Sequence, residues 1–372
     1  MNAFYAHKAP DAIWWEFVTG PSRLVAETAL HLSEGKSVCV RAADGIPFRG
    51  TFFQSVADAL RATDNSLLFD EAIEADVDPG AYLSESFGIQ ANYRPHIPYA
   101  DFLKSSGVLK NRLIPVVASG DMADRWVRFI RSLKSASLSD GLFLLESGQE
   151  LPASAFAASA SKTICVLDYA GFITEYDALV FAGMIAEDDG QSVAAKRYIA
   201  ALAVSLHGKN AENTADFIAG YSIGQNPAVI LPDIEFQDEE LAYRLWNAQV
   251  QELFPLVTRK THEFIKAWRE QIDDAFAYIQ ESRGYQNSLF PLGLTDSHGE
   301  PVNSPEEMEL AVISYLARKR RRDSAGNETA EYVLYISDDG ARERLKLLYE
   351  ARNNLAHGKA CPTPDIERLL RL

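Results

Sequence analysis

An arginine and a histidine near the end of the chain have the types and spacing for chemistry on a phosphate ester. Arg352 and His357 lie in the string LYEARNNLAHG, residues 348–358. A guanidinium binds a phosphate through two parallel hydrogen bonds and stabilises negative charge that builds up at phosphorus. An imidazole just before a helix-ending glycine, here Gly358, lies where the helix dipole favours its protonated form, which suits a general acid. The pair therefore predicts acid-assisted chemistry at a phosphate group.

A single helix is expected to position both side chains. Residues 338–358 have helical spacing, and Asn353 and His357 share one face of such a helix. Arg352 lies about 100° round the helix from Asn353, so it can flank the same cleft. The alternative is a structural role. A histidine before a helix-ending glycine often bonds the last carbonyls, and Arg352 could pair with Glu350 or with a neighbouring helix.

The string RNNLAHG, at the end of an otherwise helical segment, resembles the closing motif of HEPN domains, and the resemblance covers roughly residues 240–372. In that superfamily the arginine, the polar residue after it and the histidine line an RNA-cleaving cleft, usually shared across a homodimer. Carried over, these positions are Arg352, Asn353 and His357. The resemblance implies that the 2′-hydroxyl of the RNA is the nucleophile, that no metal or other cofactor takes part, and that the product is a 2′,3′-cyclic phosphate. Because many HEPN domains are inert, catalysis is left open.

One concentrated basic run precedes this motif and is a candidate for RNA binding: it consists of Arg318, Lys319, Arg320, Arg321 and Arg322. Its cations could hold an RNA backbone or an acidic protein surface. The alternative is a solvated helix end, where cations are favoured. The net charge is −16 and lies entirely before residue 301, since twelve basic and twelve acidic residues follow that point. This acidic charge argues against a broad positive face that binds nucleic acid, but it is compatible with a small basic site in the C-terminal part.

The first part of the chain alternates apolar runs with amphipathic stretches. Strands are expected at residues 37–42, 65–72, 112–119, 140–147 and 162–172. Helices are expected at residues 22–35, 51–62 and 121–135, and a helical stretch at residues 194–222 with Gly208 as a stop. Thr51 is the expected N-cap of the second helix. Strands separated by helices predict a mostly parallel sheet covered on both faces. We therefore predict an α/β plus all-α chain: an α/β domain at residues 1–225, a linker at 226–240, and a C-terminal helical, HEPN-like bundle at 241–372.

The order of elements in the α/β domain resembles a P-loop or AAA-type ATPase core, but the phosphate loop is missing. That loop needs G-x-x-x-x-G-K-[ST] between a strand and a helix. Here Gly35-Lys36-Ser37 follows a helix instead, and Leu30 takes the place of the first glycine. The loop after the first strand, ADGIPFRG, contains an aspartate and a proline where donors are needed. We predict a degenerate NTPase-like domain with a regulatory or binding role, the alternative being a variant nucleotide site at residues 44–51.

Acidic residues end two of the expected strands. Glu146 follows GLFLL and Asp168 follows ICVL, the shape of a magnesium-holding strand. Without a phosphate loop, we interpret both as core strands that end at the surface.

The C-terminal part is expected to be almost wholly helical. Pro255 is expected to kink or break a long helix at residues 238–282. A capping box formed by Ser304 and Glu307 predicts a helix through residue 322. Residues 328–337 could form a strand or an insertion, and Thr363 starts a final short helix.

The cell interior is the expected location. The three cysteines, Cys39, Cys165 and Cys361, are expected to be free thiols in a reducing compartment. No apolar stretch is long enough to span a membrane, and the N-terminal residues lack the pattern of a secretory signal.

The leading hypothesis is a cytoplasmic, homodimeric HEPN-type endoribonuclease or RNA-binding effector, fitting a role in stress or antiviral defence. Its α/β domain could bind a protein partner. The alternative is a non-enzymatic dimerisation or adaptor protein with an inert HEPN domain. The acidic charge and the missing phosphate loop favour this alternative.

Overall fold

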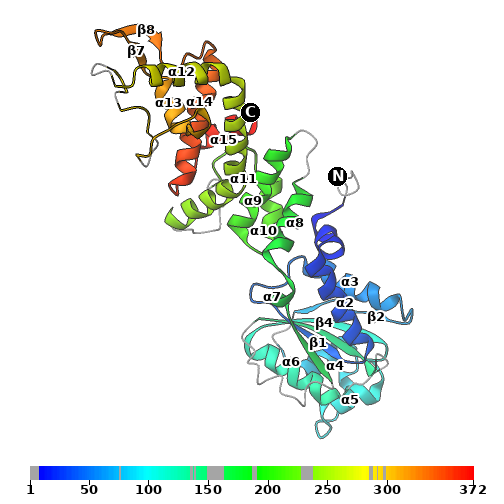
Figure 1. Ribbon diagram of the computed structural model, residues 1–372. Coiled ribbons are helices and arrows are strands. Elements are labelled where there is room, and N and C mark those ends of the chain that lie inside the picture. Colours follow the sequence, from blue (N-terminus) through cyan, green and yellow to red (C-terminus); the bar gives the residue numbers. More distant parts are fainter. Residues whose placement is uncertain are drawn as a thin grey trace. The chain divides into compact units, whose positions relative to one another are not determined.

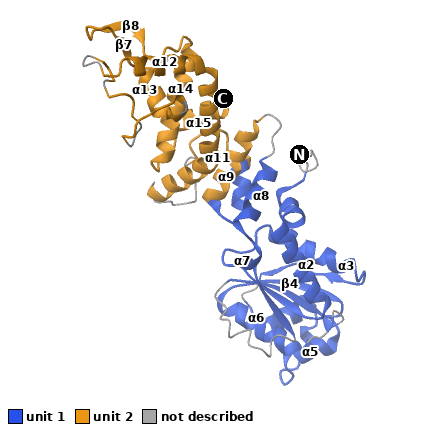
Figure 2. Ribbon diagram, in the orientation of Figure 1, with its two compact units in different colours: residues 1–187, 207–218 blue, residues 188–206, 219–372 orange. Residues whose placement is uncertain are grey.

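The computed structural model describes residues 8–74, 77–134, 137, 140–148, 163–186, 191–227, 238–284, 288–290, 292–295 and 299–372. The chain divides into two compact units (Figure 2): residues 1–187 with 207–218 form unit 1, and residues 188–206 with 219–372 form unit 2. This division differs from the ranges expected from the sequence, and whether those ranges fold independently stays a prediction. Most of the expected linker, residues 228–237, lies outside the described residues.

Helix α9, Val193–His207, explains why the division differs. Arg244 of α11, Asp238–Ala267, donates to the carbonyls of Ser205 and Leu206 at the C-terminal end of α9, at 2.9 and 3.2 Å. The Ser205 hydroxyl in turn donates to the Arg244 carbonyl at 2.7 Å. These bonds attach α9 to the helices of unit 2, a long-range pairing that the pattern of α9 itself does not encode.

Unit 1 is built on a parallel sheet covered by helices, which confirms the expected α/β class (Figure 1). Its strands are β1 Ser37–Arg41, β2 Leu68–Phe69, β3 Ile73–Glu74, β4 Arg112–Ala118, β5 Leu142–Ser147 and β6 Ile164–Asp168. Their order is β2-β4-β5-β1-β6, with β3 also paired to β4, and every pair is parallel. The first strand therefore lies inside the sheet, between β5 and β6.

Alternating side chains along each strand fill two cores. In β5, Leu142 and Leu144 face one core, and Phe143 and Leu145 face the other, all of them buried. Helices α2 Thr19–Ser33 and α3 Arg49–Arg61 contribute to the first core. Helices α4 Pro79–Ser86, α5 Tyr99–Ser106 and α6 Gly120–Leu133 contribute to the second. Both faces are thus covered, as continuous apolar strands require.

The start of α3 corrects one sequence prediction. Thr51 is not its N-cap: α3 begins at Arg49, after Phe48, whose φ of 49° is left-handed. Thr51 therefore lies inside the first turn of α3, and its hydroxyl donates to Asp11 at 2.6 Å.

Short helical elements complete unit 1. They are α1 Pro10–Ala12, a π-helix at Ile13–Phe17, a 3-10 turn at Gln90–Asn92, α7 Tyr169–Phe172, α8 Glu175–Ile185 and α10 Ala211–Gly220. Asp177, in the first turn of α8, is buried and accepts hydrogen bonds from the backbone and hydroxyl of Thr174, at 2.8 and 2.6 Å. It also accepts from the Gly20 N–H of α2 at 2.9 Å, so one carboxylate caps α8 and fastens it to α2.

Asp177→Ala is expected to lower the free energy of unfolding of unit 1 by about 1.5 kcal/mol near neutral pH, through the lost cap and the unsatisfied Gly20 N–H. Burial acts to raise the pKa of Asp177, but the hydrogen bonds from Thr174 and Gly20 outweigh it and lower the pKa below its usual 3.8. The stabilisation is therefore present above that pH and is lost as the pH falls through the folded-state pKa. Urea titrations over a pH series measure it. Exposed Asp216→Ala is the control, and a loss that stayed constant into strong acid would contradict the argument.

Unit 2 is a set of packed helices with one small hairpin (Figure 1). After α9 and α11 come α12 Arg269–Glu281, α13 Leu310–Leu316, β7 Arg320–Arg322, β8 Glu328–Tyr332, α14 Asp339–Ala356 and α15 Thr363–Leu370. Helices α11 and α14 pack against each other, and α13 and α15 also contact α14. The helix at the expected 338–358 and the final short helix at Thr363 are both confirmed. No helix in the described part of the chain has the length and apolarity to cross a membrane.

The helix expected to kink or break at Pro255 continues past it as α11 and ends just before Trp268, so it does not break at Pro255, and a kink there stays a prediction. Another expectation about unit 2 is wrong. The helix expected through residue 322 ends at Leu316, and the arginines at 320–322 form a strand. The chain folds back at this point, because the Val333 N–H donates to the Lys319 carbonyl at 2.7 Å and so replaces helix bonds with hairpin bonds.

The expected capping box is also absent. Ser304 precedes a 3-10 turn, Pro305–Glu307, and its side chain caps nothing. The Glu307 carboxylate accepts instead from the Asn303 N–H at 2.8 Å.

Candidate functional site

The C-terminal end of α14 has a glycine cap, as expected. Gly358 has a φ of 73°, the left-handed conformation that glycine adopts without strain. Beyond it, the Lys359 N–H donates to the Asn354 carbonyl at 2.9 Å, and the His357 N–H donates to the Asn353 carbonyl at 3.1 Å. His357 is therefore the last residue of a well-satisfied helix end.

Contacts from α11 hold this end in place. The Trp246 indole N–H donates to the Leu355 carbonyl at 2.8 Å, and Leu355 itself is 1% exposed. The Gln249 side chain accepts from the Cys361 N–H at 2.6 Å, just after the cap. Because both sides of the turn are bonded to one neighbouring helix, the residues between them have a defined position.

Of the three predicted site residues, His357 lies between these two bonds, and Arg352 and Asn353 lie in the helical turn just before them. His357 is exposed, whereas Arg352 and Asn353 are half-buried. The Arg352 guanidinium donates to the Asn353 side-chain oxygen at 3.3 Å. The guanidinium and imidazole thus belong to one helix end, the imidazole exposed and the guanidinium half-buried. Their role in catalysis stays a prediction.

The structure divides the five residues of the basic run. Arg321 is bonded to Asp274 of α12, and its guanidinium lies 4.9 Å from the centre of the Tyr278 ring. Arg318 donates to the Ser314 carbonyl at 3.0 Å. Lys319 and Arg320 each lie over a tyrosine ring, and Arg320 and Arg322 are exposed. RNA binding by this run is not decided by these contacts and stays a prediction.

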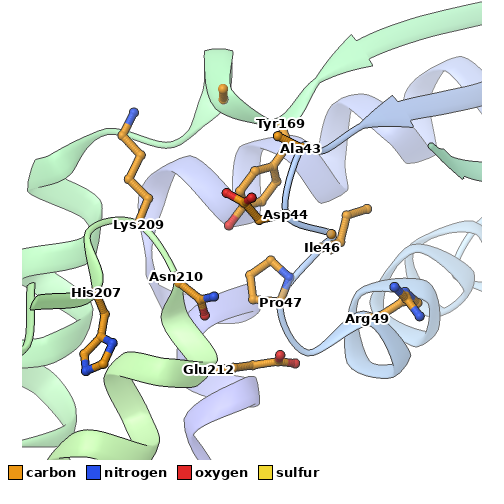
Figure 3. A pocket seen from close by; sticks show the side chains of 12 residues that line it. Ala43, Asp44, Ile46, Pro47, Arg49, Tyr169, His207, Lys209, Asn210 and Glu212 are labelled. Carbon is orange, nitrogen blue, oxygen red and sulfur yellow. The ribbon is translucent and has the colours of Figure 1, made fainter. Parts of the chain in front are cut away.

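A second candidate site lies in unit 1, at the carboxyl ends of β1, β5 and β6. Ligands of open parallel sheets bind outside these ends, where the strand order reverses. Two cavities of about 360 and 530 Å³ adjoin the loop after β1. Figure 3 shows the first, with Asp44 and Pro47 on one side and Lys209 and Asn210 on the other.

The side chain of Glu146, on β5, lies beneath the loop after β1 and accepts hydrogen bonds from it. Its carboxylate, 4% exposed, accepts from the Ile46 N–H at 3.1 Å and from two nitrogens of Arg49, at 2.6 and 3.0 Å. Hydrogen bonding to Glu146 raises the pKa of Arg49. One backbone N–H of the loop after β1 and the Arg49 guanidinium are therefore already bonded to the protein's own carboxylate.

Further bonds fix the walls of the first cavity. Glu212 of α10 accepts from the Phe48 N–H, and the Lys209 ammonium donates to the Ile173 carbonyl at 2.7 Å. Burial raises the pKa of the Tyr169 hydroxyl, which stays neutral in the wall. The cavity thus combines both signs of charge, and its lining residues Arg49, Lys209 and Glu212 are already paired within the protein.

The outcome corrects one sequence interpretation of the strand ends. Glu146 does not end a strand at the surface but is buried, because Arg49, at the start of α3, neutralises it. Asp168 does lie near the surface, where it pairs with Arg41 at 3.0 Å. The Arg49–Glu146 pair was missed, since its members are 97 residues apart and only the sheet brings them together.

Comparisons with known proteins leave the family open. No protein-family model and no curated protein matches the chain. Among solved structures, it is similar to one titled as the Aeropyrum pernix ORC2 protein in ADPNP-ADP complexes, with a TM-score of 0.34 and 12% identity over 90% of this chain and 93% of that one. A likeness at this level supports no conclusion about fold or function.

Proposed function

We propose that unit 2 is an HEPN-type module that binds and cleaves RNA through Arg352, Asn353 and His357. The observation that supports it is the exposed imidazole of His357 at a helix end held by Trp246, close in sequence to a half-buried guanidinium. A buried, fully bonded pair would have favoured a structural role instead.

In the proposed reaction the ribose 2′-hydroxyl attacks the adjacent phosphorus, and the bond to the 5′-oxygen of the next nucleotide breaks. Arg352 uses one N–H on Asn353 and has further donors for the phosphate oxygens. Asn353 thereby holds the guanidinium in place. His357 gives a proton to the leaving 5′-oxygen, and the 2′-hydroxyl proton passes to solvent. The products are a 2′,3′-cyclic phosphate and a 5′-hydroxyl.

The proposal extends to the assembly and to unit 1. As the resemblance implies, two copies of the chain would form the RNA-cleaving cleft together as a homodimer. The expected location of this dimer is the cytoplasm. Unit 1 would be a degenerate NTPase-like domain that binds a protein partner or regulates the activity of unit 2, and it would not hydrolyse a nucleotide. The bonds that the Ile46 N–H and the Arg49 guanidinium donate to Glu146 support this, because they engage a backbone donor and a cation of the loop where a phosphate would bind.

The test is incubation of the purified chain with total RNA. We expect cleavage by the unaltered protein and its loss in Arg352→Ala, because no other cation then grips the phosphate. Arg371→Ala, an exposed arginine paired with Glu367 in the same unit, is the matched control and should cleave normally. Cleavage that persists in Arg352→Ala, or that never occurs in the unaltered protein, would remove the catalytic proposal.

A further inference from the structure

The hairpin of unit 2 has two chemically different sides. Strands β7 and β8 pair in antiparallel fashion (Figure 1), with Arg320 opposite Tyr332, Arg322 opposite Glu328 and a shift of register between the two arginines. Because such an irregularity interrupts the alternation of side chains, the sides are assigned from exposure and contacts: Arg320 and Arg322 are exposed, whereas Arg321 contacts α12. Tyr332, directly across from Arg320, belongs to the same face as Arg320.

The inner side is fastened to the helices. Arg321 is bonded to Asp274, and its guanidinium lies against the Tyr278 ring. The Tyr278 hydroxyl also accepts from the Arg322 N–H at 2.9 Å. Arg321 is therefore committed to attaching the hairpin to α12, and its charge is already paired.

The outer side offers cations and an aromatic ring to solvent, and the exposed carboxylate of Glu328 lies opposite Arg322. Arg320 and Arg322 are exposed, and the Arg320 guanidinium lies 5.5 Å from the centre of the Tyr332 ring. Tyr332 is 37% exposed, and Tyr335, just beyond the strand, is 59% exposed. Neither arginine has a carboxylate partner among the ion pairs of the described residues. Unpaired guanidinium groups beside an exposed ring are thus held on a two-stranded support.

This combination suits a polymer with anionic links and flat, exposed bases. Proteins that bind single-stranded nucleic acid join cations that follow the phosphates with aromatic rings on which bases stack. Bases in a duplex are already stacked and paired, so a tyrosine ring gains little from them. A duplex would also need a broader positive face, whereas this chain has a net charge of −16 and only this local run.

We infer that the outer face of the hairpin, formed by Arg320, Arg322 and Tyr332, binds single-stranded RNA, with the arginines on phosphates and a base stacked on Tyr332. The inference rests on the proposed function in taking RNA as the ligand, and it adds a binding surface distinct from the residues of the α14 end. It also assigns different roles to neighbouring arginines: Arg320 and Arg322 bind, and Arg321 supports.

The test is fluorescence anisotropy of a short labelled RNA with the full chain carrying His357→Ala, so that binding is measured without cleavage. Tyr332→Ala should weaken binding of the single strand about tenfold, and Tyr332→Phe should retain it. Arg320→Ala with Arg322→Ala should weaken binding and reduce the slope of log affinity against log salt by about 1.4. Arg371→Ala controls for the loss of an exposed cation, and thermal melting of each variant checks the fold.

Three results would overturn the inference: equal affinity for a duplex of the same sequence, no effect of Tyr332→Ala, or displacement of the RNA by polyglutamate at equal charge. The last would identify the face as a site for an acidic protein surface. The two proposals fail separately. Stacking-dependent binding by a chain that cleaves nothing would refute only the catalytic proposal, and cleavage unaffected by the hairpin variants, with no loss of binding, would refute only this one.

Discussion

Glu146→Ala is expected to lower the free energy of unfolding of unit 1 by about 3 kcal/mol. The change removes the acceptor of the Ile46 N–H and leaves Arg49 without its buried partner. Breaking a buried ion pair from one side costs about 3–5 kcal/mol, and the lower end applies here because Arg49 is 35% exposed and water can solvate part of its charge. Urea unfolding followed by tryptophan fluorescence and circular dichroism measures the loss.

Two neighbouring variants separate the parts of this effect. Glu146→Gln keeps an acceptor for Ile46 but loses the charge, so its loss should be intermediate. Glu74→Ala removes the second carboxylate of Arg49, at 3.4 Å, but Glu74 is 74% exposed and its removal should cost little. If Glu146→Ala cost no more than Glu74→Ala, the β1 loop would not depend on the internal carboxylate.

Replacing every ribose 2′-hydroxyl of an RNA substrate by 2′-O-methyl is expected to abolish its cleavage, because the proposed nucleophile is then absent. His357→Ala should slow cleavage of the unmodified RNA by about 10²–10⁴-fold, the usual contribution of a positioned general acid. Single-turnover assays with end-labelled RNA measure both effects. The shortened products should carry 2′,3′-cyclic phosphates, which resist phosphatase until they are opened by acid.

Matched controls keep this second result specific. Asn354→Ala changes a half-buried side chain of the same helix end, whose backbone carbonyl still accepts from Lys359. It should cleave at nearly the rate of the unaltered chain. Cleavage of the 2′-O-methyl RNA, or 5′-phosphate product ends, would indicate attack by water and a different site. No cleavage under any condition would favour the adaptor alternative.

Local patterns were reliable where one segment carries its own signal. The helix expected at residues 338–358 is present as α14, and Gly358 ends it. The apolar runs at 112–119 and 140–147 are β4 and β5. The wrong predictions also came from patterns within one segment, but the interactions that overrode them come from other segments of the chain. The helix expected through residue 322 competes with pairing to residues 328–332, and Thr51, the expected cap, lies inside α3 and donates to Asp11.

The amino-acid sequence by itself determined the class of the fold, the strands β1, β4, β5 and β6, the helix α14, and the grouping of Arg352, Asn353 and His357 at one helix end. These depend on periodicity, caps and spacing, which act over a few residues. Only the tertiary structure decided that Glu146 occupies the β1 loop, and that Arg321 supports the hairpin while Arg320 faces solvent. Each of these contacts is between segments that are far apart in the chain. The free energy of burying or pairing a charge depends on which partner the fold places beside it.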